Sequence, residues 1–414
     1  MDNVKVANRS MFVLSVILTG AIAGAFVWFL LFVMELGLSF IWERVPLFLG
    51  QLYPVIMCTI GGVVIGLFAR RYGQYPEKLM DVMAKVKTTG RYDYKDLGPM
   101  SVAALLPLIF GGSVGPEAGL VGAIAAICTW VGDRMRCFGN DFQELTRVGT
   151  YATVSAIFTA PLYGFADAVT GERVDGYDTP HVTKRMKVLI YALAILGAVG
   201  AYILLSHLIG GGMHMPQFDD VGYGTEEFLW LIPLALIGGI CGLAYCILDD
   251  RFEHVGKRFE DKPVARATFA GLLLGLCGML LPLTMFAGES QAVELQETWV
   301  TMTAAALICT GLVKIVITAL CVNMGWRGGH FFPVIFSGIA IGYGTSVLIG
   351  IDPIFCVCAV TASLVGGVLR KPVLAVLLLF LCFPLHSVAV LLIAAVIGAR
   401  MPLPKRLMGD SAGH

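Results

Sequence analysis

Residues 109–120, IFGGSVGPEAGL, interrupt a long apolar run with Gly111, Gly112, Gly115 and Pro116. A helix that begins inside a membrane leaves its first N–H groups unpaired within the helix. Its dipole places about half a positive charge at that end. Glycine lets the backbone bend and lets a ligand approach, while proline in the first turn costs no hydrogen bond. This stretch therefore predicts a helix start that can hold a dehydrated anion on backbone N–H groups.

The composition around this stretch is that of a membrane protein. The 414 residues are 57% hydrophobic and 14% charged, with a mean hydropathy of +0.81, whereas soluble domains carry about 25% charged residues. We predict an all-α, multi-pass integral membrane protein, because many apolar runs approach the roughly 20 residues that span a bilayer. The runs are 11–34, 52–69, 100–132, 151–169, 188–210, 229–248, 267–287, 300–322, 331–350, 354–381 and 385–399.

Charge and cysteine usage exclude several classes of function. The formal net charge is zero, which gives no reason to expect nucleic acid. The 11 cysteines show no C-x-x-C pair and lie mostly in apolar runs, so they predict neither a disulfide framework nor a metal site, and no cofactor is expected. Short, scattered polar stretches leave no room for a soluble catalytic domain.

Basic residues predict the orientation in the cell inner or plasma membrane. Lys5 and Arg9 precede the first apolar run, which we interpret as a spanning helix rather than a signal peptide because no small-residue cleavage site follows. Arg400, Lys405 and Arg406 follow the last run. The positive-inside rule then places both termini in the cytoplasm. The charged stretch 249–265 is expected to be a loop that forms a cytoplasmic connection.

The G-G-x-x-x-P pattern occurs twice. We call residues 111–116 the first glycine break and residues 328–333, GGHFFP, the second, 217 residues later (328 minus 111). Pro161 and Pro372 form another pair, 211 residues apart (372 minus 161). Interrupted segments at matching places of two halves indicate a midplane site in a transporter fold, although two short matches can arise by chance. The predicted organisation is a first half (1–212), a polar connection (213–228), a second half (229–401) and a short cytoplasmic tail (402–414).

Together these motifs resemble the CLC family of chloride channels and antiporters. The first break resembles the family's G-(K/R)-E-G-P, the second its G-x-F-x-P, and Gly73-Gln74-Tyr75-Pro76 is weakly similar to the end of G-S-G-I-P. Residues 369–386 resemble the segment that leads to the family's last helix. The resemblance implies a homodimer with one anion pathway per subunit, built from two inverted halves of tilted and broken helices. It also implies a prokaryotic type without C-terminal regulatory domains.

The resemblance places Val114 where the family has its gating glutamate. That glutamate occupies the anion pathway and can carry a proton, whereas valine can do neither. The departure favours passive conduction of chloride or a similar anion over proton coupling. Glu117 has two interpretations: a displaced gate almost one turn further on, or a first-turn carboxylate stabilised by the helix dipole. The family's internal proton glutamate falls near Gly171, which leaves Glu172 and Asp167 as alternatives for carrying protons.

The resemblance also assigns an anion-binding set. The serine of the first family motif corresponds to Gly73, and the tyrosine before the last helix corresponds to His386. His386 is either a pH-dependent donor to the anion or a histidine that bonds a helix end. The backbone of the two breaks is expected to hold the anion. The predicted pathway residues are Gly73, Gln74, Tyr75, Val114, Gly115, Pro116, His330, Phe331, Phe332 and His386.

Three rival functions remain from the sequence. The first is an anion/proton antiporter that uses Glu117 or Glu172. The second, more distant, is an intramembrane enzyme with Ser113 or Ser337 as nucleophile and His330 or His386 as base, although no known spacing orders these residues. The third is a receptor that does not conduct, which measurable flux would exclude. We expect a transport protein and not an enzyme.

Overall fold

The computed structural model describes residues 2–44, 50–73, 75–77, 79–89, 91–134, 150, 184–211, 216–219, 221–222, 224–380 and 382–404. Within these residues the regular secondary structure is helical, apart from one isolated bridge between Gly115 and Gly329. Seven of the helices are long and apolar enough to cross a membrane. The predicted all-α, multi-pass membrane class is therefore confirmed.

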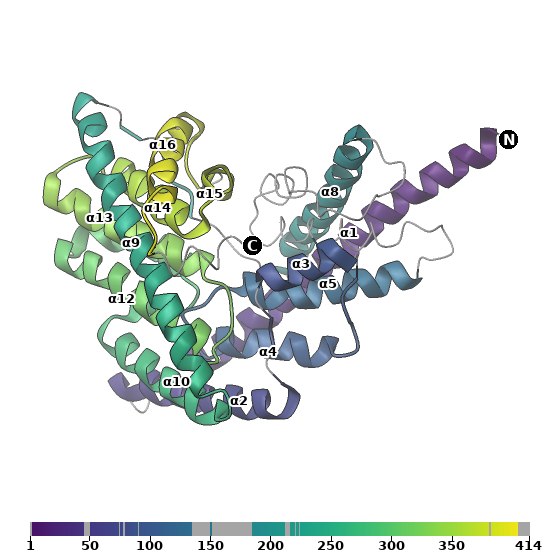
Figure 1. Ribbon diagram of the computed structural model, residues 1–414, viewed down its shortest axis with the longest axis horizontal. Helices are drawn as coiled ribbons and strands as arrows, with labels where there is room; N and C mark the ends of the chain where they lie inside the picture. The colour runs from purple at the N-terminus through teal and green to yellow at the C-terminus, as the bar shows by residue number, and fades with distance from the viewer. Residues whose placement is uncertain are drawn as a thin grey trace. The chain divides into compact units, whose positions relative to one another are not determined.

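The chain forms two compact units, each assembled from separate stretches of sequence (Figure 1). The first unit holds residues 1–37, 76–105 and 117–213, and the second holds residues 38–75, 106–116 and 214–414. Residues 38–75 and 106–116 thus group with the C-terminal residues in the second unit. The two halves as inverted repeats stay a prediction.

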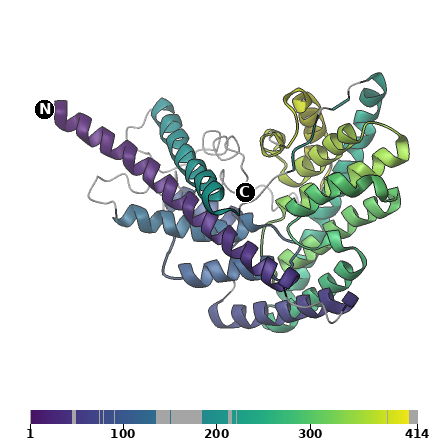
Figure 2. The same cartoon turned by 180° about the vertical axis from the view of Figure 1, so that it is seen from behind.

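In the first unit, small residues let two long helices approach closely. The unit is built from α1 (Asp2–Leu38), α3 (Leu79–Thr89), most of α4 (Leu97–Ile109) and α5 (Pro116–Arg134), and α8 (Lys184–Ile209). A Cβ placed on Gly20 or Gly24 of α1 would overlap the carbonyl oxygen of Ala194 or Ala198 in α8. The two helices lie side by side in both views (Figure 2). Close contact through small residues is the usual way in which membrane helices pack.

The second unit is held together by contacts among several of its helices. Here α2 packs on α10, α9 packs on α14, and α14 also contacts α13 and α16. Glycines again mark the crossings, as at Gly62 against Ala267 and Gly366 against Ala395. The helices are α2 (Tyr53–Tyr72), α9 (Thr225–Arg258), α10 (Pro263–Leu280), α11 (Glu289–Thr298), α12 (Ala304–Asn323), α13 (Phe331–Ile349), α14 (Pro353–Leu369), α15 (Pro372–Leu379) and α16 (Val388–Ala399). Short helical turns complete the unit at Ser39–Arg44, Gly50–Leu52, Pro282–Thr284, Trp299–Thr301 and Leu385–Ser387.

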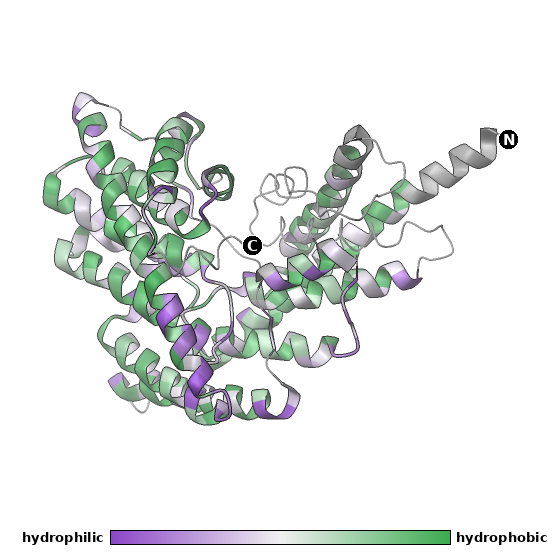
Figure 3. Cartoon of the chain, viewed as in Figure 1, coloured by the Kyte–Doolittle hydropathy of each residue, from purple (hydrophilic) through white to green (hydrophobic). Residues whose placement is uncertain are grey.

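Two sequence expectations need correction. The stretch 249–265 is not a loop: α9 continues to Arg258 and α10 begins at Pro263. Lys257 pairs with Glu253 at 3.0 Å, an i,i+4 ion pair that favours the helix. Polar residues gather on this end of α9, beyond its apolar span (Figure 3). The polar connection also ends earlier than predicted, because α9 already begins at Thr225.

The apolar run 354–381 is divided into two helices. Helix α14 ends at Leu369, Arg370 takes a left-handed conformation (φ 57°), and α15 begins at Pro372. Proline at a first helical position and a left-handed residue after a helix end are the expected signals for such a division. Helices shorter than a full span, such as α15 with 8 residues, agree with the expectation of broken helices.

Candidate functional site

The two glycine breaks meet through their backbones. The N–H of Gly115 donates to the carbonyl of Gly329, and the N–H of Gly329 donates to the carbonyl of Gly115, each at 2.7 Å. Helix α5 begins at the next residue, Pro116, and α13 begins two residues after Gly329, at Phe331. The pair of motifs found 217 residues apart in sequence is thus joined in space.

Three successive carbonyls where α4 passes into the first break each accept a hydrogen bond. The indole of Trp42 donates to Ile109 at 3.0 Å, the thiol of Cys58 lies 3.5 Å from the carbonyl of Phe110, and the N–H of Phe286 donates to Gly111 at 3.0 Å. The last carbonyls of a helix have no partner in the helix itself. These contacts satisfy the end of α4 and fix the direction in which the break leaves it.

The glycines of the first break are required by their surroundings. Gly111 has φ 82°, in the left-handed region that glycine adopts readily. A Cβ on Gly112 would lie 2.6 Å from the Pro107 carbonyl oxygen and 2.9 Å from the Trp326 ring. Ser113, fully buried, shares a hydrogen bond of 3.0 Å with Thr318 of α12. The break is therefore a fixed structure rather than an open loop.

Val114 is fully buried and lies against the second break. A Cβ on Gly328 would come within 2.7 Å of both Cβ and Cγ2 of Val114. The position that the CLC resemblance assigns to the gate therefore holds a branched apolar side chain packed on the backbone of the facing motif. No proton can be carried by this side chain.

The bridge changes which backbone donors are available to a ligand. The N–H of Gly115, expected from sequence to face an anion, is used by Gly329. Phe331 and Phe332 are both buried in the first turn of α13, next to the second break. The ring of His330 packs against those of Tyr245 and Phe331, at 5.4 and 4.6 Å between centroids. The N-terminal end of α13, where the helix dipole favours negative charge, is the candidate for binding an anion.

Glu117 lies in the first turn of α5 and is 1% exposed. A carboxylate at this end of a helix is stabilised by the helix dipole. An ionisable group that is buried at membrane depth is also a candidate for a functional role. The structure therefore leaves both interpretations of Glu117 in place.

The remaining predicted residues are less closely tied to the breaks. Gly73 ends α2 with φ 92°, and its carbonyl accepts from the N–H of Tyr75 at 3.1 Å. His386 lies in the short turn Leu385–Ser387 before α16, and its side chain is exposed. Gln74, Asp167 and Glu172 lie outside the described residues.

The structure assigns the enzyme candidates Ser113 and Ser337 to structural contacts. Ser113 bonds Thr318, and the hydroxyl of Ser337 donates to the carbonyl of Pro333 at 2.8 Å in its own helix. Across the described part of the chain, no group of three or more His, Cys, Asp or Glu side chains could hold a metal. The geometry offers backbone donors and apolar walls instead.

Lys314 is a buried cation that sequence reasoning missed. It lies near the middle of α12, is 0% exposed, and donates to the carbonyls of residues 283–286. The signal in the sequence was a single charged residue within the apolar run 300–322. Placing a charged lysine in the middle of a membrane helix costs free energy, so such a residue is a candidate for a functional role.

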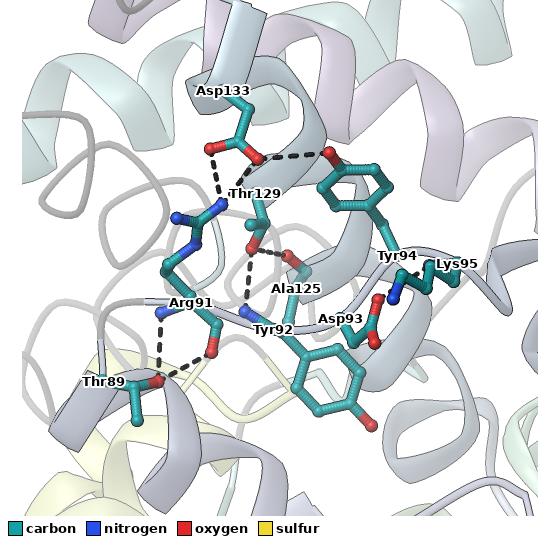
Figure 4. Close-up of polar contacts among 9 residues, drawn as sticks. All are labelled: Thr89, Arg91, Tyr92, Asp93, Tyr94, Lys95, Ala125, Thr129 and Asp133. Atoms are coloured by element: carbon teal, nitrogen blue, oxygen red, sulfur yellow. Dashed lines mark hydrogen bonds and ion pairs between the residues drawn. The ribbon is translucent and has the colours of Figure 1, made fainter.

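A polar cluster in the first unit fastens the segment before α4 to α5. Arg91 pairs with both carboxylate oxygens of Asp133 at 2.8 and 2.7 Å, and the Tyr94 hydroxyl donates to Asp133 at 3.2 Å (Figure 4). The N–H of Tyr92 donates to Thr129 at 3.0 Å, one turn earlier on α5. These groups are paired with one another, so we interpret the cluster as structural.

Comparison with known proteins identifies the relatives of this arrangement. Residues 61–402 match the family model described as "Voltage gated chloride channel". The chain is 25% identical over 346 residues to the voltage-gated ClC-type chloride channel ClcB of Citrobacter koseri, covering 78% of each chain. It is 24% identical over 316 residues to the putative ion-transport protein YfeO of Salmonella newport, covering 73% of this chain and 72% of that protein.

Solved structures share the fold at low sequence identity. A CLC-type fluoride/proton antiporter superposes with a TM-score of 0.74 at 18% identity, covering 94% of each chain. A slow cyanobacterial Cl⁻/H⁺ antiporter superposes with a TM-score of 0.75 at 18% identity, covering 94% of this chain and 93% of the other. These similarities establish the architecture.

Proposed function

The chain belongs to the voltage gated chloride channel family, whose members transport anions, and we propose that it conducts them passively, without obligatory exchange of protons. Members of this family are channels or transporters, so the enzyme alternative is excluded. The observation that carries the proposal is Val114, a fully buried apolar side chain at the gate position. Proton coupling needs a titratable group that changes places with the anion, and valine has none.

We propose that the anion binds at the first turn of α13, near the bridge. The dipole of the 19-residue helix favours negative charge at this end, and the second glycine break lets a ligand approach it. Buried apolar side chains around the turn lower the local dielectric and strengthen these dipoles. Binding by dipoles rather than by a fixed charge at the turn suits conduction, because the anion must also leave.

The decisive experiment measures anion and proton movement together. Purified protein in liposomes is given an outward chloride gradient with valinomycin present, and chloride efflux and internal pH are recorded. We expect chloride efflux without uphill proton movement. Proton uptake against its gradient, driven by chloride efflux, would contradict the proposal.

The alternative is an antiporter in which Glu117 carries the proton. Its burial favours this alternative, and relatives of the same fold are named as antiporters. Glu117→Gln keeps the shape of the side chain but cannot carry a proton, so it separates the two. On the passive proposal the variant shows the same ratio of protons to chloride as the wild type, namely zero.

We also propose that the protein works as a homodimer with a separate pathway in each subunit, as the family resemblance implies. Crosslinking in native membranes, followed by mass measurement in detergent, tests the stoichiometry. Inactivating one subunit of a tandem dimer is expected to leave about half of the flux, because the proposed site lies within a single unit of one chain.

A further inference from the structure

Lys314 donates to carbonyl oxygens of four consecutive residues. The distances from Nζ are 3.3 Å to Leu283, 3.4 Å to Thr284, 2.8 Å to Met285 and 3.0 Å to Phe286. We call these four carbonyls the Lys314 cage. The ammonium also lies 4.7 Å from the centre of the Phe336 ring of α13, a cation–π contact. The amino group near the middle of α12 therefore contacts four backbone carbonyls and one aromatic ring.

The cage holds the segment that supports the first glycine break. Phe286 closes the cage with its carbonyl and donates its own N–H to the carbonyl of Gly111 at 3.0 Å. Phe286 has φ 60°, which a non-glycine residue adopts only when its surroundings impose it. Its ring meets that of Trp42 edge-on at 5.2 Å, and Trp42 donates to Ile109.

The face of α12 that carries Lys314 also contacts the first glycine break directly. Thr318 lies four residues after Lys314 and so on the same side of α12. Its hydroxyl bonds that of Ser113, next to Val114. Helix α12 thus acts on the first break at two points, through Thr318 and through the Lys314 cage.

We infer that Lys314 is a positioning residue that sets the conformation of the first glycine break, and thereby the selectivity of the anion pathway. The inference rests on the proposed function for its transport consequence. Its structural consequence, the conformation of residues 106–116, is independent of what the protein transports.

The test compares Lys314→Met with the wild type in two measurements. Methionine fills a similar volume but leaves the four carbonyls without their shared donor. We expect chloride flux to fall on the order of 10-fold and the chloride-to-nitrate permeability ratio to shift, since a displaced break changes the site and not only the fraction folded. We also expect faster hydrogen–deuterium exchange in peptides that cover residues 106–116.

Matched variants separate positioning from general damage. Asn323→Ala removes a 2.6 Å hydrogen bond from the last residue of α12 to Asp249 of α9, which belongs neither to the Lys314 cage nor to the Ser113–Thr318 contact, and is expected to keep the wild-type permeability ratio. Lys314→Arg retains a buried donor and is expected to recover part of the flux. Thr318→Val releases Ser113, and its effect on the ratio should be non-additive with that of Lys314→Met, because both residues hold the same segment.

The following outcomes decide whether Lys314 positions the first glycine break. If Lys314→Met does not fold, Phe336→Leu removes the ring over the ammonium while keeping the lysine, and it should shift the ratio in a milder form. A folded Lys314→Met protein with unchanged ratio and unchanged exchange at residues 106–116 overturns the inference. A wild-type protein without anion flux overturns the proposed function, and the exchange measurement then still decides whether Lys314 positions the break.

Discussion

Val114, at the proposed gate, is the residue whose substitution tests how the pathway responds to pH. The side chain is fully buried against Gly328 and carries no titratable group. A carboxylate in the same place would compete with the anion when ionised and would stop competing when protonated. On the proposed function, a carboxylate at this position would therefore make the flux depend on pH.

Val114→Glu is the substitution that tests this. At about pH 7.5 we expect chloride flux to fall on the order of 10-fold, because the ionised carboxylate repels the anion at short range. Flux should recover as the pH falls and the carboxylate becomes neutral. Efflux from liposomes across a pH series measures both effects. Val114→Gln is the control: equal flux deficits in the two variants at every pH would show that size, and not charge, is responsible.

His386 permits a second test at this scale. Its side chain is exposed in a short turn before α16, whereas the residues around the bridge are buried. A solvent-exposed histidine interacts only weakly with a dehydrated anion. We therefore expect His386→Phe to leave the pH profile of the flux unchanged. A profile that loses a step near pH 6–7 in this variant would assign the donor role to His386 after all.

The helices pack through glycines that have no room for a side chain. On α2, a Cβ at Gly62 would overlap the Ala267 carbonyl oxygen of α10. Such overpacking costs about 1–3 kcal/mol. In contrast, Gly200 of α8 has nothing within 4 Å of an added Cβ, and glycine in a helix costs roughly 0.5–1 kcal/mol relative to alanine.

Gly62→Ala is therefore expected to lower the thermal unfolding midpoint in detergent, and Gly200→Ala to leave it unchanged or raise it. Scanning fluorimetry of the two purified variants makes the comparison. An unchanged midpoint for Gly62→Ala would mean that α2 and α10 can move apart without cost, contrary to the packing described above.

Some of these elements are readable from sequence and others are not. Glycine and proline predicted both breaks, because they act on the local backbone. The bond between Gly115 and Gly329 could not be predicted, since nothing local indicates which distant carbonyl accepts a given N–H. The charged stretch 249–265 was misjudged as a loop because its polarity reflects position outside the apolar span, while its helix-forming residues and the Glu253–Lys257 pair continue α9.

For the whole molecule, the number of membrane crossings decides where the termini lie. An odd number would place them on opposite sides. The described residues contain seven helices long enough to cross, and the apolar run 151–169 lies outside them. Three shorter apolar helices are also described, at Leu97–Ile109, Pro353–Leu369 and Leu385–Ala399, so the placement of both termini in the cytoplasm stays a prediction.

Reporter fusions test this topology. Alkaline phosphatase, which is active only in the periplasm of a bacterial host, is expected to be inactive at either terminus, while green fluorescent protein should be bright at both. Opposite signals at the two ends would show that the number of crossings is odd and that the basic residues at one terminus do not set its side.

The reciprocal bonds between Gly115 and Gly329 belong wholly to the main chain. No exchange of one side chain for another deletes their donors, except a change to proline, so a conventional alanine scan will pass over them and report only on neighbours such as Val114 and Thr318. Replacing the Gly115 amide by an ester through semisynthesis removes a single N–H and leaves every side chain in place. The two hydrogen bonds that join the motifs can thus be tested by chemical changes to the backbone, whereas genetic substitution of side chains leaves them almost untested.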